Sequence, residues 1–147
     1  MPSLEYAAGA DLPLAAVVRL YDAVGWTAYT ESPQTLAAAL AGSTRVAVAW
    51  EDAELVGLAR VISDGHSICY LQDILVDPQH QRTGLGRQLA ELVLAPFAHV
   101  RQKVLLTDTE PGQKAFYEAL GYRQAGGNAG DNDDGGLPLR AFVRFDA

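Results

Sequence analysis

The segment from Leu71 to Leu89, LQDILVDPQHQRTGLGRQL, contains the residues whose types and spacing could do chemistry. An apolar stretch passes through a polar turn into a leucine-rich stretch with helical spacing. The first N–H groups of a helix lack intrahelical acceptors, and the helix dipole places partial positive charge there. Gly84 and Gly86 have no Cβ atom, so a phosphate could approach the backbone, and Arg82 and Arg87 could add charge-assisted hydrogen bonds. The residues of this predicted anion site are Gln81, Arg82, Thr83, Gly84, Leu85, Gly86 and Arg87.

Two glycines before a helix are compatible with more than one kind of site. The loop is not a Walker A motif, because the Gly-Lys-Ser/Thr sequence is absent. It is not a dinucleotide fingerprint either, because no third glycine follows at the required spacing. The glycines could serve helix packing alone. A nucleotide-binding protein that uses the same helix N-terminus also stays open, although a phosphate-clamping lysine and an evident pair of metal-binding carboxylates are missing.

The elements that must position this segment follow from the hydrophobic pattern. Apolar residues at helical spacing predict helices from Asp11 to about Gly25, over 33–41, over 84–100 and over 111–121. Runs rich in Val, Ile and Leu predict strands over 3–6, 45–50, 55–62, 67–76, 103–107 and 139–145. The strand–helix–strand unit over 67–107 should be parallel, and the three strands within 45–76 should form an antiparallel meander. We therefore expect an α/β (α+β) fold with a mixed, mostly antiparallel sheet flanked by helices.

Capping and breaking residues refine the expected helices. Asp11 is the expected N-cap of the first helix, with Pro13 just inside it. Ser32 is the expected N-cap of the second helix. Pro96 should end the regular part of the third helix early. The Gly/Asp/Asn-rich stretch over 125–136 is expected to be a loop.

Length and composition limit the class of protein. The 147 residues, 49% hydrophobic and 20% charged, are typical of one globular domain. A formal net charge of −7 argues against a surface for nucleic acid or for an anionic membrane. Cys69 is the only cysteine and the three histidines show no ligand spacing, so no metal site is expected. Neither a secretory signal nor a run of roughly 18 apolar residues is found, and the expected compartment is the cytoplasm.

A second motif, FYEALGY over 116–122, makes the interpretation of the segment from Leu71 to Leu89 more specific. Together with the order of the elements, the two motifs resemble the GNAT superfamily of acyl-CoA-dependent N-acetyltransferases over most of the chain. The Asp73-Ile74-Leu75 tripeptide is similar to the usual sequence of that family's fourth strand. The other residues that carry the resemblance are Val76, Pro78, Gln81, Gly84, Gly86, Phe116, Tyr117, Gly121 and Tyr122.

The resemblance implies one N-acetyltransferase domain over 1–147 that uses acetyl-CoA as co-substrate. In this family the fourth and fifth strands splay apart, and acetyl-CoA enters the gap between them. Main-chain groups of Ile74, Leu75 and Val76 would bind the pantetheine arm, and N–H groups of 81–87 would hold the pyrophosphate. The acceptor amine would attack the acetyl carbon directly in a ternary complex. The alternative is a non-catalytic acyl-CoA sensor or scaffold of the same fold.

Tyr117 matches the tyrosine that many family members direct at the cofactor sulfur. A phenol, with a pKa of about 10, can protonate a departing thiolate or stabilise it by a hydrogen bond. The alternative is a packed aromatic side chain on an amphipathic helix, and Phe116 fits that role better. We expect Phe116, Ala119 and Leu120 to face inward.

Asp73 is the nearest candidate for the general base that removes a proton from the amine. Strand alternation places it on one face with the apolar Leu71 and Leu75. A carboxylate on such a face is either a base or a buried acid that orients a neighbouring loop. His66 and Glu110 are lesser candidates for the base.

The GWTAYT segment over 25–30 joins the first two helices and is unusually aromatic. In the family this region lines the acceptor pocket, so the resemblance implies that Trp26 and Tyr29, with Thr30 beside them, bind the acceptor. Alternatively the rings attach the helices to the sheet. The acidic residues Asp131, Asp133 and Asp134 could attract a cationic amine or simply be solvated. The expected partner is a small-molecule or peptide amine, and homodimers are common in the family.

Overall fold

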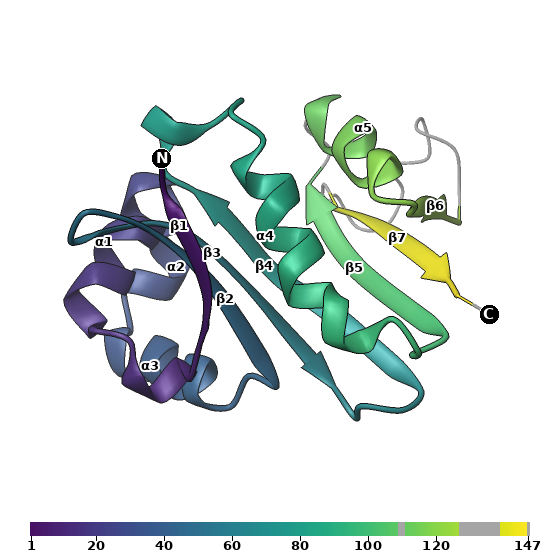
Figure 1. Cartoon of the computed structure of the whole chain (residues 1–147), viewed down its shortest axis with the longest axis horizontal. Coiled ribbons are helices and arrows are strands. Elements are labelled where there is room, and N and C mark those ends of the chain that lie inside the picture. Colours follow the sequence, from purple (N-terminus) through teal and green to yellow (C-terminus); the bar gives the residue numbers. More distant parts are fainter. Residues whose placement is uncertain (109–110, 127–138, 147) are drawn as a thin grey trace. The chain divides into compact units, whose positions relative to one another are not determined.

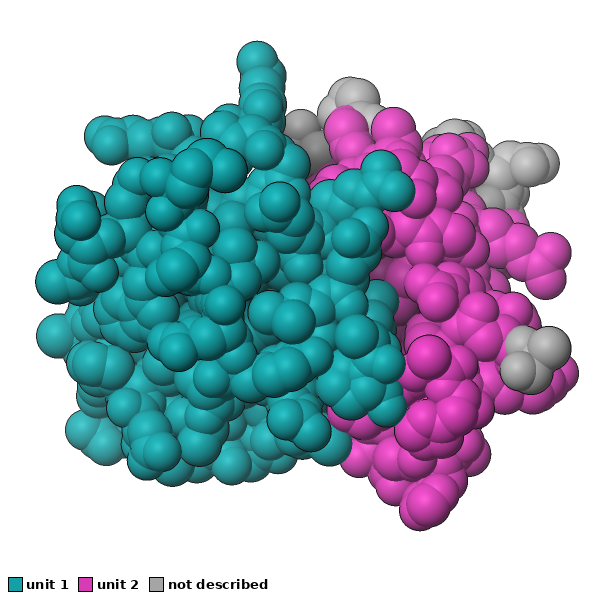
Figure 2. All heavy atoms as spheres, in the orientation of Figure 1, with its two compact units in different colours: residues 1–62, 72–96 teal, residues 63–71, 97–147 magenta. Residues whose placement is uncertain are grey.

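The computed structural model describes residues 1–108, 111–126 and 139–146 (Figure 1). The chain forms two compact units (Figure 2): unit 1 consists of residues 1–62 and 72–96, and unit 2 of residues 63–71 and 97–147. The described strands have the order β1-β2-β3-β4-β5-β7-β6. The expected mixed sheet flanked by helices is thereby confirmed. The expectation of one domain stays a prediction.

Unit 1 combines an antiparallel arrangement of strands with most of the helices. Its strands are β1 (Ser3–Ala7), β2 (Arg45–Glu51), β3 (Glu54–Ser63, all but its last residue) and the second half of β4 (Ile68–Val76). Its helices are α1 (Leu14–Ala23), α2 (Thr27–Thr30), α3 (Pro33–Ala41) and α4 (Leu85–Leu94). Strand β2 pairs antiparallel with both β1 and β3. Helices α1, α2 and α3 lie close together in Figure 1, and they enclose the core of this unit with the strands.

The core of unit 1 explains why these segments fold together. Its fully buried apolar side chains come from α1, α3 and the strands, and half-buried Trp26 and Tyr29 pack against them. The core residues are Val17, Leu20, Tyr21, Leu36, Leu40, Val46, Val48, Leu55, Leu58 and Leu75. Leu75 places the end of β4 in this core, so the strand that precedes the predicted anion site is anchored by burial.

Unit 2 is built on the first half of β4. This half pairs parallel with β5 (Gln102–Asp108), from Ile68↔Gln102 to Leu71↔Leu105, as the strand–helix–strand unit predicts. Strand β7 (Leu139–Phe145) pairs antiparallel with β5, and β6 (Arg123–Ala125) with β7. Helix α5 (Pro111–Ala119) supplies Tyr117, whose ring packs on Phe142 of β7.

Most predicted boundaries agree with the structure within a few residues, and Pro96 acts as expected. Helix α4 ends at Leu94 and continues as a 3-10 turn over Ala95–Phe97. The prediction for the start of α1 is wrong. Asp11 belongs to a 3-10 turn, and Pro13 is the N-cap residue with an extended backbone. A proline N-cap leaves no N–H at that position to satisfy.

Two short elements and one helix face differ from the prediction. The hydrophobic pattern predicts neither helix α2 nor strand β6, because their four and three residues carry no readable periodicity. In α5 the structure buries Tyr117, leaves Phe116 half-buried and exposes Ala119, and it buries Leu120 directly after the helix. Among the described residues, no helix is long and apolar enough to cross a membrane.

Candidate functional site

Helix α4 begins at the glycine-rich end of the predicted anion site. Gly84 is its N-cap residue and has a left-handed backbone with φ of +85°. A Cβ atom added there would meet nothing within 4 Å, so the backbone is open to an approaching group. Arg82 also has a positive φ, +63°, which is uncommon for a residue with a side chain. The loop thus places two left-handed residues just before N–H groups that a helix leaves without intrahelical acceptors.

Side-chain hydrogen bonds hold this loop on the end of β4. The Gln81 amide Nε2 donates to the Val76 carbonyl at 3.2 Å, and the Thr83 hydroxyl donates to the His80 carbonyl at 2.6 Å. The Asp77 carboxylate accepts from the Gln79 N–H at 3.0 Å. These polar side chains therefore shape the loop, and its backbone N–H groups are the part left to meet a ligand.

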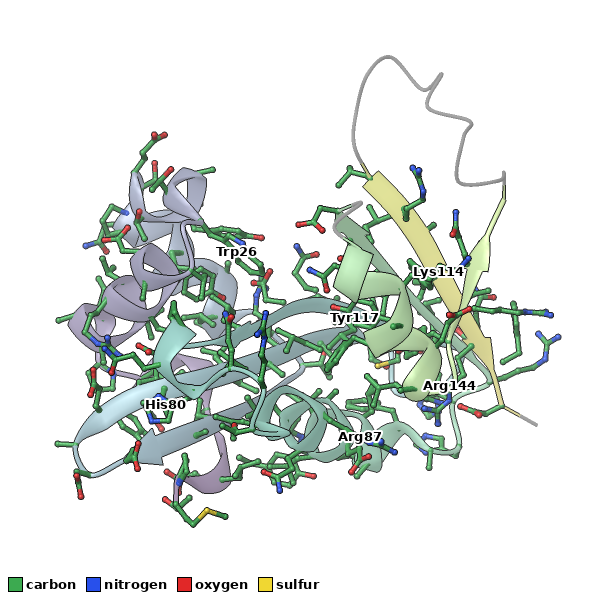
Figure 3. All side chains as sticks on the ribbon, turned by 90° about the horizontal axis from the view of Figure 1, so that it is seen from above. Trp26, His80, Arg87, Lys114, Tyr117 and Arg144 are labelled. Carbon is green, nitrogen blue, oxygen red and sulfur yellow. The ribbon has the colours of Figure 1, made fainter. Side chains whose placement is uncertain are left out.

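The two arginines of the predicted anion site have exposed side chains. Arg87 Nε donates to the Glu91 carboxylate at 2.8 Å, an i,i+4 ion pair along α4 with both partners more than half exposed. Arg87 is labelled in Figure 3. An exposed pair of this kind stabilises little, so a bound anion can compete with Glu91 for the guanidinium.

A second set of charges fixes the base of the loop. His80, labelled in Figure 3, contacts the Glu51 carboxylate through Nε2, and this hydrogen bond raises the pKa of His80 and lowers that of Glu51. Arg19 bonds the Asp77 carboxylate at 3.3 Å and the Leu55 carbonyl at 2.6 Å. The pKa of Asp77 is lowered: burial raises it, but the N–H of the loop and Arg19 lower it more. Ion pairs of His80 with Glu51 of β2 and of Asp77 with Arg19 of α1 therefore anchor the loop.

Asp73 lies at the centre of a buried polar cluster of unit 1. Arg60 Nε of β3 donates to Asp73 Oδ2 at 2.6 Å, and both side chains are buried, with 6% and 3% of each residue exposed. The Tyr21 hydroxyl of α1 donates to the same oxygen at 2.9 Å. The Tyr29 hydroxyl of α2 donates to Oδ1 at 3.1 Å and accepts from Gln72 Nε2 at 3.2 Å. The carboxylate is thus shared by three donors from three elements.

The pKa values of the partners reflect this burial. Burial first, and the Asp73 carboxylate second, raise the pKa of Tyr21 and of Tyr29. Burial alone would lower the pKa of Arg60, but the adjacent carboxylate raises it overall. Both hydroxyls therefore stay protonated donors and Arg60 stays charged at neutral pH.

An aromatic group covers one side of this cluster. The Tyr21 ring centroid lies 5.1 Å from that of Tyr29 and 6.0 Å from that of Trp26. Trp26 and Tyr29 are half-buried, so each ring has one part in the core and one part facing outward. Trp26 is labelled in Figure 3 on the segment before α2. Both readings of these rings, attachment to the core and a wall for a ligand, are compatible with this geometry.

Tyr117 belongs to unit 2, where it is 8% exposed (Figure 3). Its ring packs on Phe116, Tyr122 and Phe142 at centroid distances of 5.0, 6.2 and 5.8 Å. The Tyr122 hydroxyl is buried and has no hydrogen-bond partner among the described residues, and burial raises its pKa. Burial also raises the pKa of the Cys69 thiol to about 11, so this cysteine is a packed, unreactive group.

The structure brings some predicted site residues together within unit 1. Asp73 and Tyr29 share a hydrogen bond, and Trp26 packs beside Tyr29. Residues 81–87 form the loop and first turn of α4, and Ile74, Leu75 and Val76 form the end of β4. Glu110 and the acidic residues of the stretch over 125–136 lie outside the described residues. Within the described part of the chain, no three His, Cys, Asp or Glu residues are grouped to hold a metal ion.

Sequence reasoning missed the partners of Asp73 and the anchors of the loop. Arg60 had a signal, since it is the one charge inside the apolar run over 55–62, as Asp73 is within its own strand. Two lone charges of opposite sign in neighbouring buried strands suggest an ion pair. His80 and Glu51 lie 29 residues apart and had no comparable signal.

Comparisons with known proteins agree with this geometry. A family model described as an acetyltransferase (GNAT) domain matches residues 16–135. A solved GNAT-family acetyltransferase from Streptococcus pneumoniae TIGR4 is 31% identical, with a TM-score of 0.72 over 82% of this chain and 86% of its own. The ribosomal-protein-S18-alanine N-acetyltransferase of Escherichia coli has a TM-score of 0.75 over 100% and 95% of the two chains. At 20% identity, that likeness shows the fold alone.

The curated relatives are longer than this chain. A histone acetyltransferase of Glycine max is 31% identical over 130 residues, which are 80% of this chain and 54% of that protein. The match to a Gibberella zeae protein covers 39% of this chain and 34% of that protein, at 40% identity. The chain thus spans about half and about a third of the lengths of these two relatives.

Proposed function

The chain belongs to the GNAT family of acetyltransferases, and on this premise we propose that it transfers the acetyl group of acetyl-CoA to a primary amine. The transfer would be direct, in a complex that holds both substrates. The thioester supplies an activated acetyl group, so this chain's residues need only bind, orient and move protons. The buried Cys69, with its raised pKa, is not needed as a nucleophile.

The observation that carries the proposal is the open N-terminus of α4. Gly84 and Arg82 have left-handed backbones, and hydrogen bonds from Gln81 and Thr83 hold the loop in this shape. A diphosphate fits such a cradle because it accepts several N–H donors at once and meets the positive end of the helix dipole. Residues 81–87 would hold the pyrophosphate of CoA, and main-chain groups of Ile74, Leu75 and Val76 the pantetheine arm.

Tyr117 is the proposed general acid. A phenol can donate its proton to a thiolate as the thiolate leaves. Tyr117 is 8% exposed as a residue. Its rigid aromatic surroundings support the role, since they hold the ring in one orientation.

Asp73 is the proposed acceptor-side carboxylate. Its contacts favour the orienting role over the role of a general base. Arg60, Tyr21 and Tyr29 already donate to it, and it is 3% exposed. Three donors around a carboxylate that is 3% exposed leave little access for an amine, which favours the orienting role. Trp26 and Tyr29 remain the proposed wall of the acceptor pocket.

The acceptor class is proposed as a small-molecule or peptide amine, in keeping with an acidic chain that favours a cationic partner over a polyanion. The cytoplasm as compartment and the homodimer stay predictions.

The test is the release of free CoA thiol from acetyl-CoA in the presence of amines of different classes. The panel contains a polyamine, an amino acid, an aminoglycoside and a peptide with a free N-terminus. We expect at least one amine to accelerate thiol release well above the rate without amine, with acetylated amine as the second product. Tight binding of acetyl-CoA without turnover of any amine would instead favour the non-catalytic sensor.

The nucleotide-binding alternative is separated by thermal shift. We expect acetyl-CoA and CoA to raise the unfolding temperature, since a ligand that binds only the folded state stabilises it. ATP lacks the pantetheine arm and should stabilise less at the same concentration. Stabilisation by ATP but not by acetyl-CoA would contradict the proposal.

A further inference from the structure

The ion pair between Arg60 and Asp73 needs an explanation, because burying two charges is unfavourable unless their geometry is good and their remaining hydrogen-bonding groups are satisfied. The short contact of 2.6 Å joins β3 to β4 inside unit 1, and Arg60 and Asp73 are the buried charged residues of these two strands. Arg60 Nη1 also donates to the Ser43 hydroxyl at 3.3 Å. A packed apolar pair would join two strands equally well, so strand cohesion alone does not account for these charges.

The hydroxyls on the carboxylate indicate what the charges do. Oδ1 and Oδ2 accept from Tyr29 of α2 and Tyr21 of α1, so one carboxylate ties both helices to β4. The Tyr29 hydroxyl also accepts from Gln72, the residue before Asp73 on β4. Two neighbouring side chains of β4 therefore hold the Tyr29 hydroxyl.

Helix α2 needs this external support. It has four residues, no side-chain cap at its N-terminus, and follows Gly25, whose φ is +81°. A helix of this length is not stable by itself, so tertiary contacts must set its position. Its tertiary contacts include the Tyr29 hydrogen bonds, the packing of Trp26 and Tyr29 on Tyr21 and the core, and a hydrogen bond from the Trp26 main-chain N–H to the Tyr21 carbonyl at 3.0 Å.

We propose that Arg60 is a positioning residue, which holds the Asp73 carboxylate in place so that Tyr21 and Tyr29 fix α2 and the Trp26 ring as the wall of the acceptor pocket. That this wall belongs to the pocket of the acceptor amine rests on the proposed function. The positioning of Trp26 itself does not depend on turnover. Arg60 touches neither ring directly and acts through the carboxylate. Its loss should therefore loosen the wall and weaken acceptor binding, while the chemical step and the acetyl-CoA site are retained.

The test uses Trp26 as its own reporter. The chain has two tryptophans, so a Trp50→Phe background leaves Trp26 as the only one. In this background the Arg60→Met/Asp73→Asn double variant removes both charges and leaves no uncompensated buried ion, which protects the fold. Arg60→Lys keeps the charge but not the Nε–H contact. Arg45→Met is the matched control, because Arg45 is an exposed arginine of the same unit that lies over Tyr6, outside the cluster.

We expect the acrylamide quenching constant of Trp26 to rise at least about twofold in the double variant, by a smaller factor in Arg60→Lys, and not at all in Arg45→Met. In the double variant, the KM for the acceptor amine should rise about fivefold or more, measured with the amine of the panel that turns over fastest. The kcat and the KM for acetyl-CoA should stay within about twofold, which is the signature of lost binding that the ground state and the transition state share. Circular dichroism and a cooperative unfolding transition establish that each variant is folded.

Two results would overturn the inference. One is an unchanged Trp26 quenching constant in the folded double variant. The other is a fall in kcat of about tenfold or more without a rise in the acceptor KM, which would make Asp73 the general base. If no amine in the panel is acetylated by the wild type, the proposed function fails, and the quenching experiment alone still decides the positioning role.

Discussion

Tyr117 and Tyr122 belong to one short motif, and the difference between them permits a sharp test of the proposed acid. We expect Tyr117→Phe to lower kcat by about 10²-fold or more, the lower end of what general acid catalysis contributes. The KM for acetyl-CoA should change little, because the ring and its packing on Phe142 are kept. The measurement is the rate of CoA thiol release at saturating amine, with Tyr122→Phe as the control that keeps its rate. A Tyr117→Phe variant with wild-type kcat would contradict the assignment.

The Tyr122 hydroxyl gives a separate prediction about stability. It is buried in a residue that is 2% exposed, with no hydrogen-bond partner among the described residues. An unsatisfied buried hydroxyl is unfavourable, and its removal without a change of shape is neutral or stabilising. We therefore expect Tyr122→Phe to leave the free energy of unfolding unchanged or to raise it by about 1 kcal/mol. Urea unfolding measures this, and a loss of more than about 1 kcal/mol would reveal a partner for the hydroxyl.

At the scale of elements, the N-terminus of α4 can be tested with two matched glycines. Gly84 and Gly65 have φ values of +85° and +79°, and an added Cβ would meet nothing within 4 Å at either position. Alanine at either site should therefore destabilise the fold by about 1–2 kcal/mol through the backbone alone. Only Gly84→Ala places a methyl group at the proposed phosphate cradle, so only this variant should raise the Kd of acetyl-CoA, by about tenfold, or about 1.4 kcal/mol.

Calorimetric titration with acetyl-CoA and urea unfolding of both variants separate the two effects. If Gly84→Ala and Gly65→Ala lose the same stability and have the same Kd for acetyl-CoA, Gly84 has no role in binding the phosphate. A loss of affinity in Gly65→Ala as large as in Gly84→Ala would show that general destabilisation explains the result.

The same elements show what could be predicted from sequence. The alternation along β4 placed Asp73 on the buried face, and the leucines of α4 with its flanking glycines indicated where that helix begins, because both patterns are local. The hydrogen bonds that define the site are not local. Asp73 meets a hydroxyl 52 residues away on Tyr21, and His80 meets Glu51 across 29 residues. The left-handed backbone of Arg82 is set by its loop, since nothing in an arginine side chain favours it.

For the whole molecule, the distribution of charge matters more than the net charge of −7. A phosphate ligand would meet the N-terminus of α4 with Arg82 and Arg87 rather than the average surface. Carboxylates below the loop do not cancel this local field, because Asp77 is paired with Arg19 and Glu51 with His80. An acidic chain can therefore bind a polyanionic co-substrate at one place and still favour a cationic amine elsewhere.

The pairing of His80 with Glu51 should make the stability of the whole chain depend on pH. The pKa of His80 is raised from its ordinary 6.5, so its contribution is complete below about pH 6.5 and is lost as the pH rises through the raised value. The pKa of Glu51 is lowered from 4.5, so its contribution is present above about pH 4.5 and is lost as the pH falls through the lowered value. The pair therefore stabilises most between about pH 4.5 and 6.5. Asp77, 3.8 Å from His80 Nδ1, also raises the pKa of His80, and its own lowered pKa adds a contribution that is lost at low pH, as that of Glu51 is.

His80→Gln removes the charge and keeps a polar side chain, so it isolates this dependence. We expect the unfolding temperature of the wild type to exceed that of His80→Gln by more at pH 6 than at pH 9. The difference should shrink in high salt, since the Glu51 side chain is 39% exposed and its charge is screened. His66→Gln, in the turn after β3, is the control and should show no such change between the two pH values. A wild-type advantage of equal size at both pH values would mean that the contact stabilises as a neutral hydrogen bond, and the loop would then keep its anchor across the whole pH range.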